Sequence, residues 1–402
     1  MLTTGSIVCG IIHTLASTSV YTSLHESSLR ITHFLSTSTT SNTNSITTNL
    51  LISSHLHQLA MAPTKYTNRT IPKISMRDFE NRVEEITQQL IHAAETDGFF
   101  GLTNHGISVP GIETMFETSS SFFALPDETK ATVPFSHLNA GWEKNAQIRP
   151  STGQPDRKES YQMQFGANMN GCWLPEETLP GFKEKSLSFM KQCQEVSEKL
   201  MLCFARGLGF PDDYFVTAHD ISRPESQTVL RLLHYFEVDD KVPVPEGYYR
   251  AGAHVDWDFV TLLFQRPGQS GLEICPGREA STSFGLGDEW TKVEPEEGEI
   301  VCNIGDLLMS WSDDRFKSTF HRVKTPSLVG EDYFGPRYSM AFFNQPCTDA
   351  VIQGPLGKYE AVTGKEFTQA AMNRNFAALK AKKEALEGVA NGAKDGAAVA
   401  AS

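Results

Sequence analysis

The sequence predicts a mainly β protein with flanking helices. A helical and mixed N-terminal region precedes an antiparallel β-barrel or sandwich, and a C-terminal helix follows. Two observations carry this prediction. In the first half of the predicted folded part, apolar residues recur every three or four positions, which is typical of amphipathic helices. After Gln227 the apolar runs become short and are separated by Gly, Pro, Asp or Asn, which is typical of antiparallel barrels and sandwiches.

Both ends of the chain differ in composition from its middle. Residues 1–60 contain 24 Ser or Thr, one acidic residue and one basic residue, so they bury too little apolar surface to offset the entropy of ordering. The end of the chain is rich in Ala and Gly, which is typical of a frayed tail. We therefore expect a disordered extension over 1–60, an N-terminal region over 64–220, a β-core over 221–350, a C-terminal helical region over 351–386 and a disordered tail over 387–402.

The N-terminal region is predicted to alternate short strands and helices. Ile71–Ile74 is apolar but carries a Pro, which favours an edge strand. The spacing of apolar residues predicts a helix over Phe79–Thr96, and the apolar run Phe99–Thr103 predicts a strand. Further helices are expected over Gly111–Phe123, over a short segment opening at Leu125 and over Pro180–Gly207, with loops and irregular strands over 135–172.

The second half is predicted to be the β-core, with its strands separated by turn residues. The strand candidates are Val229–Phe236, His254–Gln265, Leu272–Cys275, Glu299–Asn303, Leu307–Trp311, Ser318–Val323 and Arg337–Phe343. A helix from about Thr368 to Leu386 is expected to end the folded part.

Charge and cysteine content exclude several classes of function. The 48 acidic and 35 basic residues give a formal net charge of −13, which argues against nucleic acid or an anionic membrane as the main partner. No apolar run is long enough for a membrane-spanning helix. Seven cysteines without a C-x-x-C pair argue against a disulfide framework and favour a cytoplasmic protein. No obligate protein partner is evident.

One triplet in the β-core points to metal chemistry. In a strand, His254 and Asp256 would present an imidazole and a carboxylate on the same face. His321 lies in another strand-like run and is the best candidate for a third ligand. Two His and one carboxylate form the facial triad of non-haem Fe(II) oxygenases. An H-x-D triplet alone would more often be a surface strand pair, so the wider pattern has to decide.

Four ordered blocks supply that wider pattern. They are Asp97–Ile107; His254–Asp256 followed by Thr261–Leu263; Val301–Asp306 followed by Ser318–Val323; and Pro336–Ser339. With these blocks the chain resembles the isopenicillin N synthase-like family of iron- and 2-oxoglutarate-dependent dioxygenases, and fungal members in particular. The resemblance runs from about Ile71 to Phe343. It implies a double-stranded β-helix, or jelly roll, as the core.

The resemblance also implies roles for six residues. His254, Asp256 and His321 would be the iron ligands, and no further catalytic residue is expected. Arg337 and Ser339 lie two apart in a predicted strand, so both would face the distal carboxylate of 2-oxoglutarate, and a guanidinium suits a carboxylate. Tyr235 would add a hydrogen bond to the co-substrate. The alternatives are a structural salt bridge for Arg337 and an ordinary core position for Tyr235.

Three features depart from the family pattern. Asp258 stands where the family usually has Gly, and Leu233 stands where many plant members have Asn. The two histidines are 67 residues apart, which is longer than in compact members. We attribute the excess to a loop over 278–288, read as a tolerated surface insertion rather than a lid over the substrate.

The activity implied is oxidation of a small organic molecule by hydroxylation, desaturation or ring closure, with a role in secondary metabolism. Fe(II) would be the metal, 2-oxoglutarate and dioxygen the co-substrates, succinate and carbon dioxide the by-products, and ascorbate a stimulant. Two alternatives stay open at this point. One is an iron-dependent oxidase of the isopenicillin N synthase type that uses no 2-oxoglutarate. The other is a non-catalytic β-barrel binding protein.

Overall fold

The computed structural model describes residues 64–147, 155–242, 248–282 and 288–373. The expected disordered segments 1–60 and 387–402 lie outside the described residues. Residues 364–373 are helical, and the rest of the predicted C-terminal helix, to Leu386, also lies outside them. The proposed division of the folded part at 220 and 350 stays a prediction.

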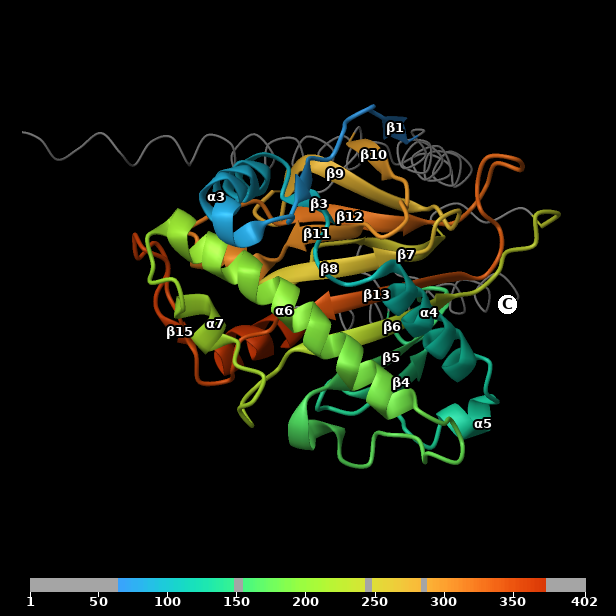
Figure 1. Ribbon diagram of the computed structural model, residues 1–402. Helices are drawn as coiled ribbons and strands as arrows, with labels where there is room; N and C mark the ends of the chain where they lie inside the picture. Colours follow the sequence, from blue (N-terminus) through green and yellow to red (C-terminus); the bar gives the residue numbers. More distant parts are fainter. Residues whose placement is uncertain (1–63, 148–154, 243–247, 283–287, 374–402) are drawn as a thin grey trace, which may run out of the picture. The chain divides into compact units, whose positions relative to one another are not determined.

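Two sheets form the core (Figure 1). The eight-stranded sheet has the order β2-β3-β11-β8-β13-β6-β5-β4. Its strands are β2 (Lys73–Ser75), β3 (Phe99–Thr103), β4 (Gly141–Lys144), β5 (Lys158–Gln164), β6 (Val229–Tyr235), β8 (Val260–Gln265), β11 (Ile300–Ile304) and β13 (Arg337–Phe343). The five-stranded sheet has the order β1-β10-β9-β12-β7. Its strands are β1 (Lys65–Tyr66), β7 (Tyr249–His254), β9 (Leu272–Glu279), β10 (Glu289–Val293) and β12 (Thr319–Lys324).

Both sheets contribute side chains to one cavity, so they face each other, and the predicted jelly-roll core is confirmed. A small hairpin of β14 (Val351–Ile352) and β15 (Val362–Thr363) follows the core. The helices are α3 (Phe79–Thr96), α4 (Val109–Phe123), α5 (Asp127–Lys130), α6 (Phe182–Leu208), α7 (Tyr214–Ala218) and α8 (Asp306–Trp311), with a 3₁₀ turn over Gly166–Met169.

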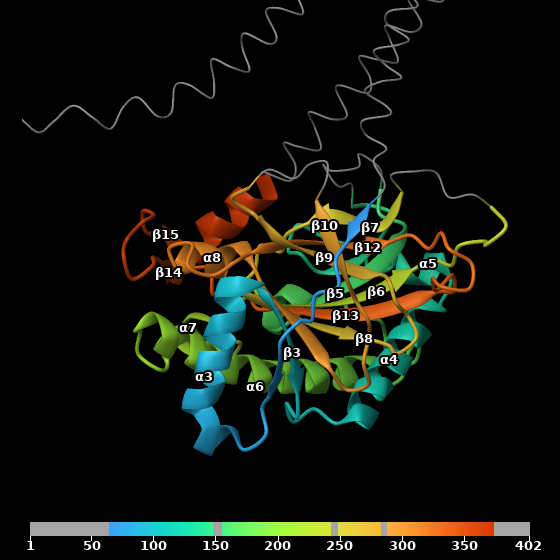
Figure 2. The ribbon, with the colours of Figure 1, turned by 90° about the horizontal axis from the view of Figure 1, so that it is seen from above.

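The long helix α6 lies across one face of the eight-stranded sheet (Figures 1 and 2). Phe189 of α6 packs against Phe264 of β8, with ring centroids 5.0 Å apart. Phe204 packs edge-on against Phe259 at 6.1 Å. All four rings are buried, so this apolar layer fixes the strands that carry pocket residues on their other face.

Gly98 shows why the turn between α3 and β3 needs its sequence. Its φ of +67° is a left-handed conformation that favours glycine. A Cβ there would lie 2.1 Å from the backbone oxygen of Lys317. The Asp97-Gly98 pair therefore lets β3 enter the sheet directly beside the segment that leads into β12.

Two strand predictions were wrong. The segment His254–Gln265 is not one strand, because β7 ends at His254 and β8 begins at Val260. A turn separates them, and in this turn the backbone oxygen of Asp256 accepts a hydrogen bond from Asp306. The run Leu307–Trp311 is helical and belongs to α8. It is only five residues long, and a short buried apolar run can form either type of element.

Of the helices in the described part of the chain, none is both long and apolar enough to cross a membrane.

His219 provides a test of acid stability that is independent of the pocket. Its Nδ1 donates a hydrogen bond of 2.7 Å to the backbone oxygen of Phe215, and burial lowers the pKa of the imidazole to about 4. An unfolded histidine titrates near 6.5, so between pH 6.5 and pH 4 His219 binds a proton in the unfolded chain but not in the folded chain. We therefore expect His219 to lower the free energy of unfolding by roughly 3 kcal/mol as the pH falls from about 6.5 to about 4.

The prediction is checked by denaturant unfolding of the wild type and His219→Gln at pH 7.5 and pH 4.5. The wild type should lose more stability between the two conditions than the variant, whose amide does not titrate. Equal losses would show that His219 is protonated in the folded state.

Candidate metal centre and its pocket

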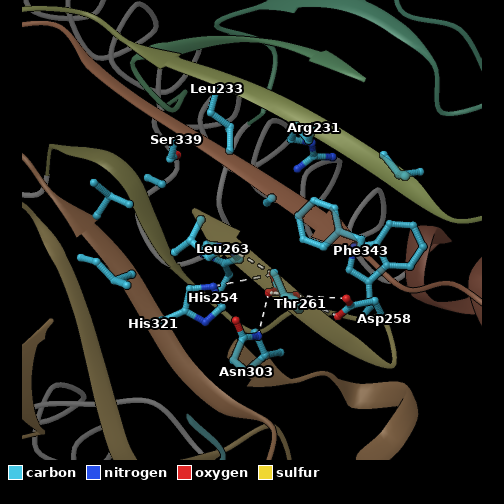
Figure 3. A pocket seen from close by; sticks show the side chains of 18 of the residues that line it. Arg231, Leu233, His254, Asp258, Thr261, Leu263, Asn303, His321, Ser339 and Phe343 are labelled. Carbon is cyan, nitrogen blue, oxygen red and sulfur yellow. Dashed lines mark hydrogen bonds and ion pairs between the residues drawn. The ribbon is translucent and has the colours of Figure 1, made fainter. Parts of the chain in front are cut away.

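Three side chains of ligand type meet at the end of the five-stranded sheet. His254 ends β7, Asp256 lies in the turn that follows, and His321 lies on β12. His254 and His321 are direct partners in the antiparallel pair of β7 and β12, and their ring centroids are 4.3 Å apart. One ligand atom of each residue lies within 4.8 Å of the other two. Figure 3 shows both histidines at the wall of the pocket.

Backbone contacts orient the ring of each histidine. Nδ1 of His254 lies 2.7 Å from the backbone oxygen of Gly252, and Nδ1 of His321 lies 3.3 Å from that of Thr319. A carbonyl oxygen only accepts, so both Nδ1 atoms carry the proton. The Nε2 atom of each ring is directed at Asp256 Oδ1, which is 3.8 Å from Nε2 of His254 and 3.7 Å from Nε2 of His321.

This donor set fits a resident Fe(II). Two imidazole nitrogens and one carboxylate oxygen converge from one side, which is the arrangement of the two-His, one-carboxylate iron sites. The hydrogen bonds from Nδ1 to the backbone are the outer contacts that commonly orient histidine ligands. The structure thus brings together the three residues that the sequence singled out as metal ligands.

Asp258, the departure from the family pattern, is fully buried beside the triad. Burial raises the pKa of its carboxyl well above the usual value, and the neighbouring Asp256 raises it further. Its backbone is held against Gly305, where a Cβ would lie 2.0 Å from the Asp258 oxygen.

The pocket has a volume of about 560 Å³ and takes side chains from β6, β7, β8, β12 and β13. Arg337 lies at one end of it and is 1% exposed. Its Nε donates to the backbone oxygen of Gln269 at 3.1 Å, and its Nη2 donates to Gln265 Oε1 at 2.7 Å. Both acceptors are neutral, and no ion pair of Arg337 occurs among the residues that the structure describes, which does not favour the alternative of a structural salt bridge.

Unsatisfied donors gather around Arg337. Its Nη1, the hydroxyl of Ser339 and Nε2 of Gln265 are buried and have no hydrogen-bond partner among the described residues. The Tyr235 ring lies 5.1 Å from the guanidinium carbon, because Tyr235 and Arg337 are paired across β6 and β13. Buried donors without acceptors are costly, so this end of the pocket is suited to an anion with several acceptor atoms.

A different set of side chains lines the end that carries Arg231. Nε of Arg231 donates to Gln162 Oε1 at 2.8 Å, and the guanidinium carbon lies 5.2 Å from the ring centre of Phe343. Trp257 also lines the pocket. Gln345 lines it too, and its Oε1 is buried with no partner in the described part of the chain. Figure 3 shows Arg231 and Phe343 beside each other, with Ser339 further along the same strands.

Among the aromatic residues near the triad in sequence or on β13, Trp257 and Phe343 line the pocket. Phe259 is instead fully buried in the core. His105 lies in the turn after β3, where its Nε2 donates to the Gly298 oxygen at 2.8 Å and its Nδ1 accepts from the Ile107 amide at 3.2 Å. His234 contacts Glu159 at 2.8 Å on the opposite face of β6.

Sequence reasoning missed four contributors to the site. Thr261 and Asn303 bond to Asp256, and both lie inside the sequence blocks that match the family, so a signal was present. Gln265 and Gln269 hold Arg337. No sequence signal pointed to them, because their contact depends on the pairing of β8 with β13.

The sequence matches the models of two protein families and is similar to several fungal proteins. Residues 226–346 match the 2OG-Fe(II) oxygenase superfamily. Residues 71–177 match the N-terminal region of the non-haem dioxygenases in morphine synthesis. A proline hydroxylase of Petromyces alliaceus is 31% identical over 298 residues, which cover 70% of this chain and 89% of the relative. A 2-oxoglutarate-dependent dioxygenase of a Dothideomycetidae species is 29% identical over 76% of this chain and 97% of that protein.

Solved structures agree with these matches. A full-length Neurospora crassa protein in complex with alpha-KG, which is 2-oxoglutarate, is 32% identical and superimposes with a TM-score of 0.65 over 75% of this chain and 95% of that one. The same Neurospora protein in complex with alpha-KG and thymine is also 32% identical, with a TM-score of 0.64 over 76% and 96% of the two chains.

Proposed function

The chain belongs to the 2OG-Fe(II) oxygenase superfamily, and we propose that His254, Asp256 and His321 hold its iron while Arg337, Ser339 and Tyr235 hold 2-oxoglutarate. It is an oxidoreductase that depends on Fe(II) and 2-oxoglutarate and oxidises a small organic molecule, as its fungal relatives indicate. These relatives favour this activity over a 2-oxoglutarate-independent oxidase and over a non-catalytic binding protein.

The residue assignment rests on two groups of side chains that line the same pocket, one suited to a metal ion and one suited to an anion. Three metal-ligand atoms converge within 4.8 Å at its wall, and a buried guanidinium with an unpartnered Nη1 lies at one end. Fe(II) held by His254, Asp256 and His321 would supply the activation of dioxygen that the 2-oxoglutarate-dependent oxidation of the substrate requires.

The residues of the chain bind and orient the reactants. Arg337 forms charge-assisted hydrogen bonds with the distal carboxylate of 2-oxoglutarate, and the Ser339 hydroxyl donates another hydrogen bond to it. The Tyr235 ring lies beside the guanidinium group and forms one side of this site. The burial of Arg337 and Ser339, each 1% exposed, keeps bulk water away from these contacts, which strengthens them.

The Arg231 end is the proposed substrate site. Arg231 lies four residues from Tyr235 on β6, and Tyr235 pairs with Arg337, so the two ends are separated by about 13 Å along the strand. Thr261, whose hydroxyl bonds to Asp256, pairs with Phe343 of β13, so the proposed ligand Asp256 is anchored toward the Arg231 end. Arg231 supplies a positively charged guanidinium group, Gln345 Oε1 supplies an acceptor, and Phe343 with Trp257 supplies aromatic surface. We therefore propose a small planar substrate that carries both a carbonyl and an N–H group.

Thymine is the first compound to test, because it has both groups and is bound by the Neurospora crassa relative. The assay measures thymine-dependent succinate formation by the iron-loaded protein with 2-oxoglutarate and ascorbate. L-proline is the comparison substrate, since another relative is a proline hydroxylase. Stimulation by thymine, and its loss in Arg231→Met, would support the planar-substrate proposal. Stimulation by proline alone would contradict it.

A further inference from the structure

The two oxygens of Asp256 have different surroundings. Oδ2 accepts a hydrogen bond of 2.6 Å from the Thr261 hydroxyl and one of 2.8 Å from Nδ2 of Asn303. Oδ1 instead faces the Nε2 atoms of the two histidines, at 3.8 and 3.7 Å. Figure 3 shows Thr261 and Asn303 close to the two histidines.

The sheet itself places both donors. Thr261 lies on β8 and Asn303 on β11, and the two are direct partners in the antiparallel register of these strands. Both residues are 3% exposed, so neither can exchange its contact for water without opening the sheet. Rotation of the Asp256 carboxylate would break two hydrogen bonds at once.

We propose that Thr261 and Asn303 are positioning residues that reserve a single oxygen of Asp256 for the metal. The inference rests on the proposed function, because it takes Asp256 as an iron ligand. A carboxylate can bind a cation through one oxygen or through both. Because Oδ2 accepts hydrogen bonds from two buried donors, only Oδ1 remains to bind the metal. Binding through one oxygen keeps open a coordination position that 2-oxoglutarate needs.

Thr261 also contacts Asp258, at 3.0 and 3.2 Å. A hydroxyl has one hydrogen to donate, and its shortest contact is the one with Asp256 Oδ2. The hydroxyl oxygen can at the same time accept. The Thr261 hydroxyl therefore connects Asp256 with Asp258. For this reason the test has to remove the hydroxyl and leave the size of the side chain nearly unchanged.

The matched variants are Thr261→Val, which removes the hydroxyl at nearly constant shape, and Thr261→Ser, which keeps it. Asn303→Leu removes the second donor. Co²⁺ serves as the probe for Fe(II), with affinity measured by calorimetry and coordination followed in the visible spectrum. Melting of the metal-free proteins shows that each variant is folded. Binding of 2-oxoglutarate to the Co²⁺-loaded proteins is measured separately.

We expect Thr261→Val and Asn303→Leu each to weaken Co²⁺ binding on the order of 10–100-fold. Their bound Co²⁺ should show an altered spectrum, and their Co²⁺-loaded forms should bind 2-oxoglutarate less tightly. Thr261→Ser should resemble the wild type in all three measurements. A folded Thr261→Val with wild-type affinity for both ligands and an unchanged spectrum would overturn the inference.

Asp256→Ala separates this outcome from a failure of the proposed function. If Asp256→Ala loses Co²⁺ binding while Thr261→Val and Asn303→Leu behave as the wild type, the ligand assignment stands and the positioning role falls. If Asp256→Ala binds Co²⁺ as the wild type does, the ligand assignment fails, and the positioning role fails with it.

Discussion

Replacing Asp256 by alanine is expected to abolish iron-dependent conversion of 2-oxoglutarate to succinate while leaving the folded core intact. Asp256 supplies the only anionic group among the three converging ligand residues, so its loss removes charge compensation as well as one ligand atom. His254→Ala and His321→Ala are expected to have the same effect, because two ligands no longer define the facial arrangement. The three side chains lie at the pocket wall and not in the apolar core, so the melting temperature of the metal-free protein should change little.

Iron content after desalting and succinate formation under saturating 2-oxoglutarate check this prediction. His105→Ala is the matched control, since His105 is a buried histidine that bonds to Gly298 and Ile107. It should lower the melting temperature and keep the iron. Full iron-dependent turnover by Asp256→Ala would refute the ligand assignment.

Replacing Arg337 by leucine is expected to raise the apparent Michaelis constant for 2-oxoglutarate by about 100-fold or more, with iron binding little changed. The distal carboxylate would be left buried and unpaired, which typically costs about 3–5 kcal/mol, and each 1.4 kcal/mol corresponds to about tenfold in affinity. Arg337→Lys keeps the charge but loses the planar fork, so its effect should be smaller. Titration of 2-oxoglutarate at saturating iron measures both variants.

This titration also tests the oxidase alternative by a separate route. An enzyme that used Arg337 to bind its main substrate would show the same 2-oxoglutarate dependence, or none, in the wild type and in Arg337→Leu. An unchanged dependence in the variant would therefore remove Arg337 from the co-substrate site.

Residues with a local pattern could be predicted from the sequence. The boundaries of β13 match the predicted strand Arg337–Phe343, because Pro and Asn, which are typical of turns, stand directly before and after this run. The histidine pair was also recognisable, since each histidine lies in a strand-like run and the blocks occur in the family order. The facing of His254 and His321 then follows from the antiparallel pairing of β7 with β12.

Features that depend on pairing between distant segments could not be predicted. Asp256 lies beyond the end of β7, so the expected same-face arrangement within one strand does not hold, and the turn brings its carboxylate toward the histidines instead. The contacts of Gln265 with Arg337 depend on the register of β8 with β13, which no local pattern encodes. The short run Leu307–Trp311 lacked a distinguishing period and formed a helix instead of a strand.

The most direct test of the account is release of labelled carbon dioxide from 2-oxoglutarate labelled at carbon 1, measured with and without added Fe(II). The wild type should release it only with iron, Asp256→Ala should stay at background at every 2-oxoglutarate concentration, and Arg337→Leu should approach the wild-type rate only at greatly raised 2-oxoglutarate. Iron-dependent release by Asp256→Ala at the wild-type rate would contradict the assignment of this pocket as the site of the reaction.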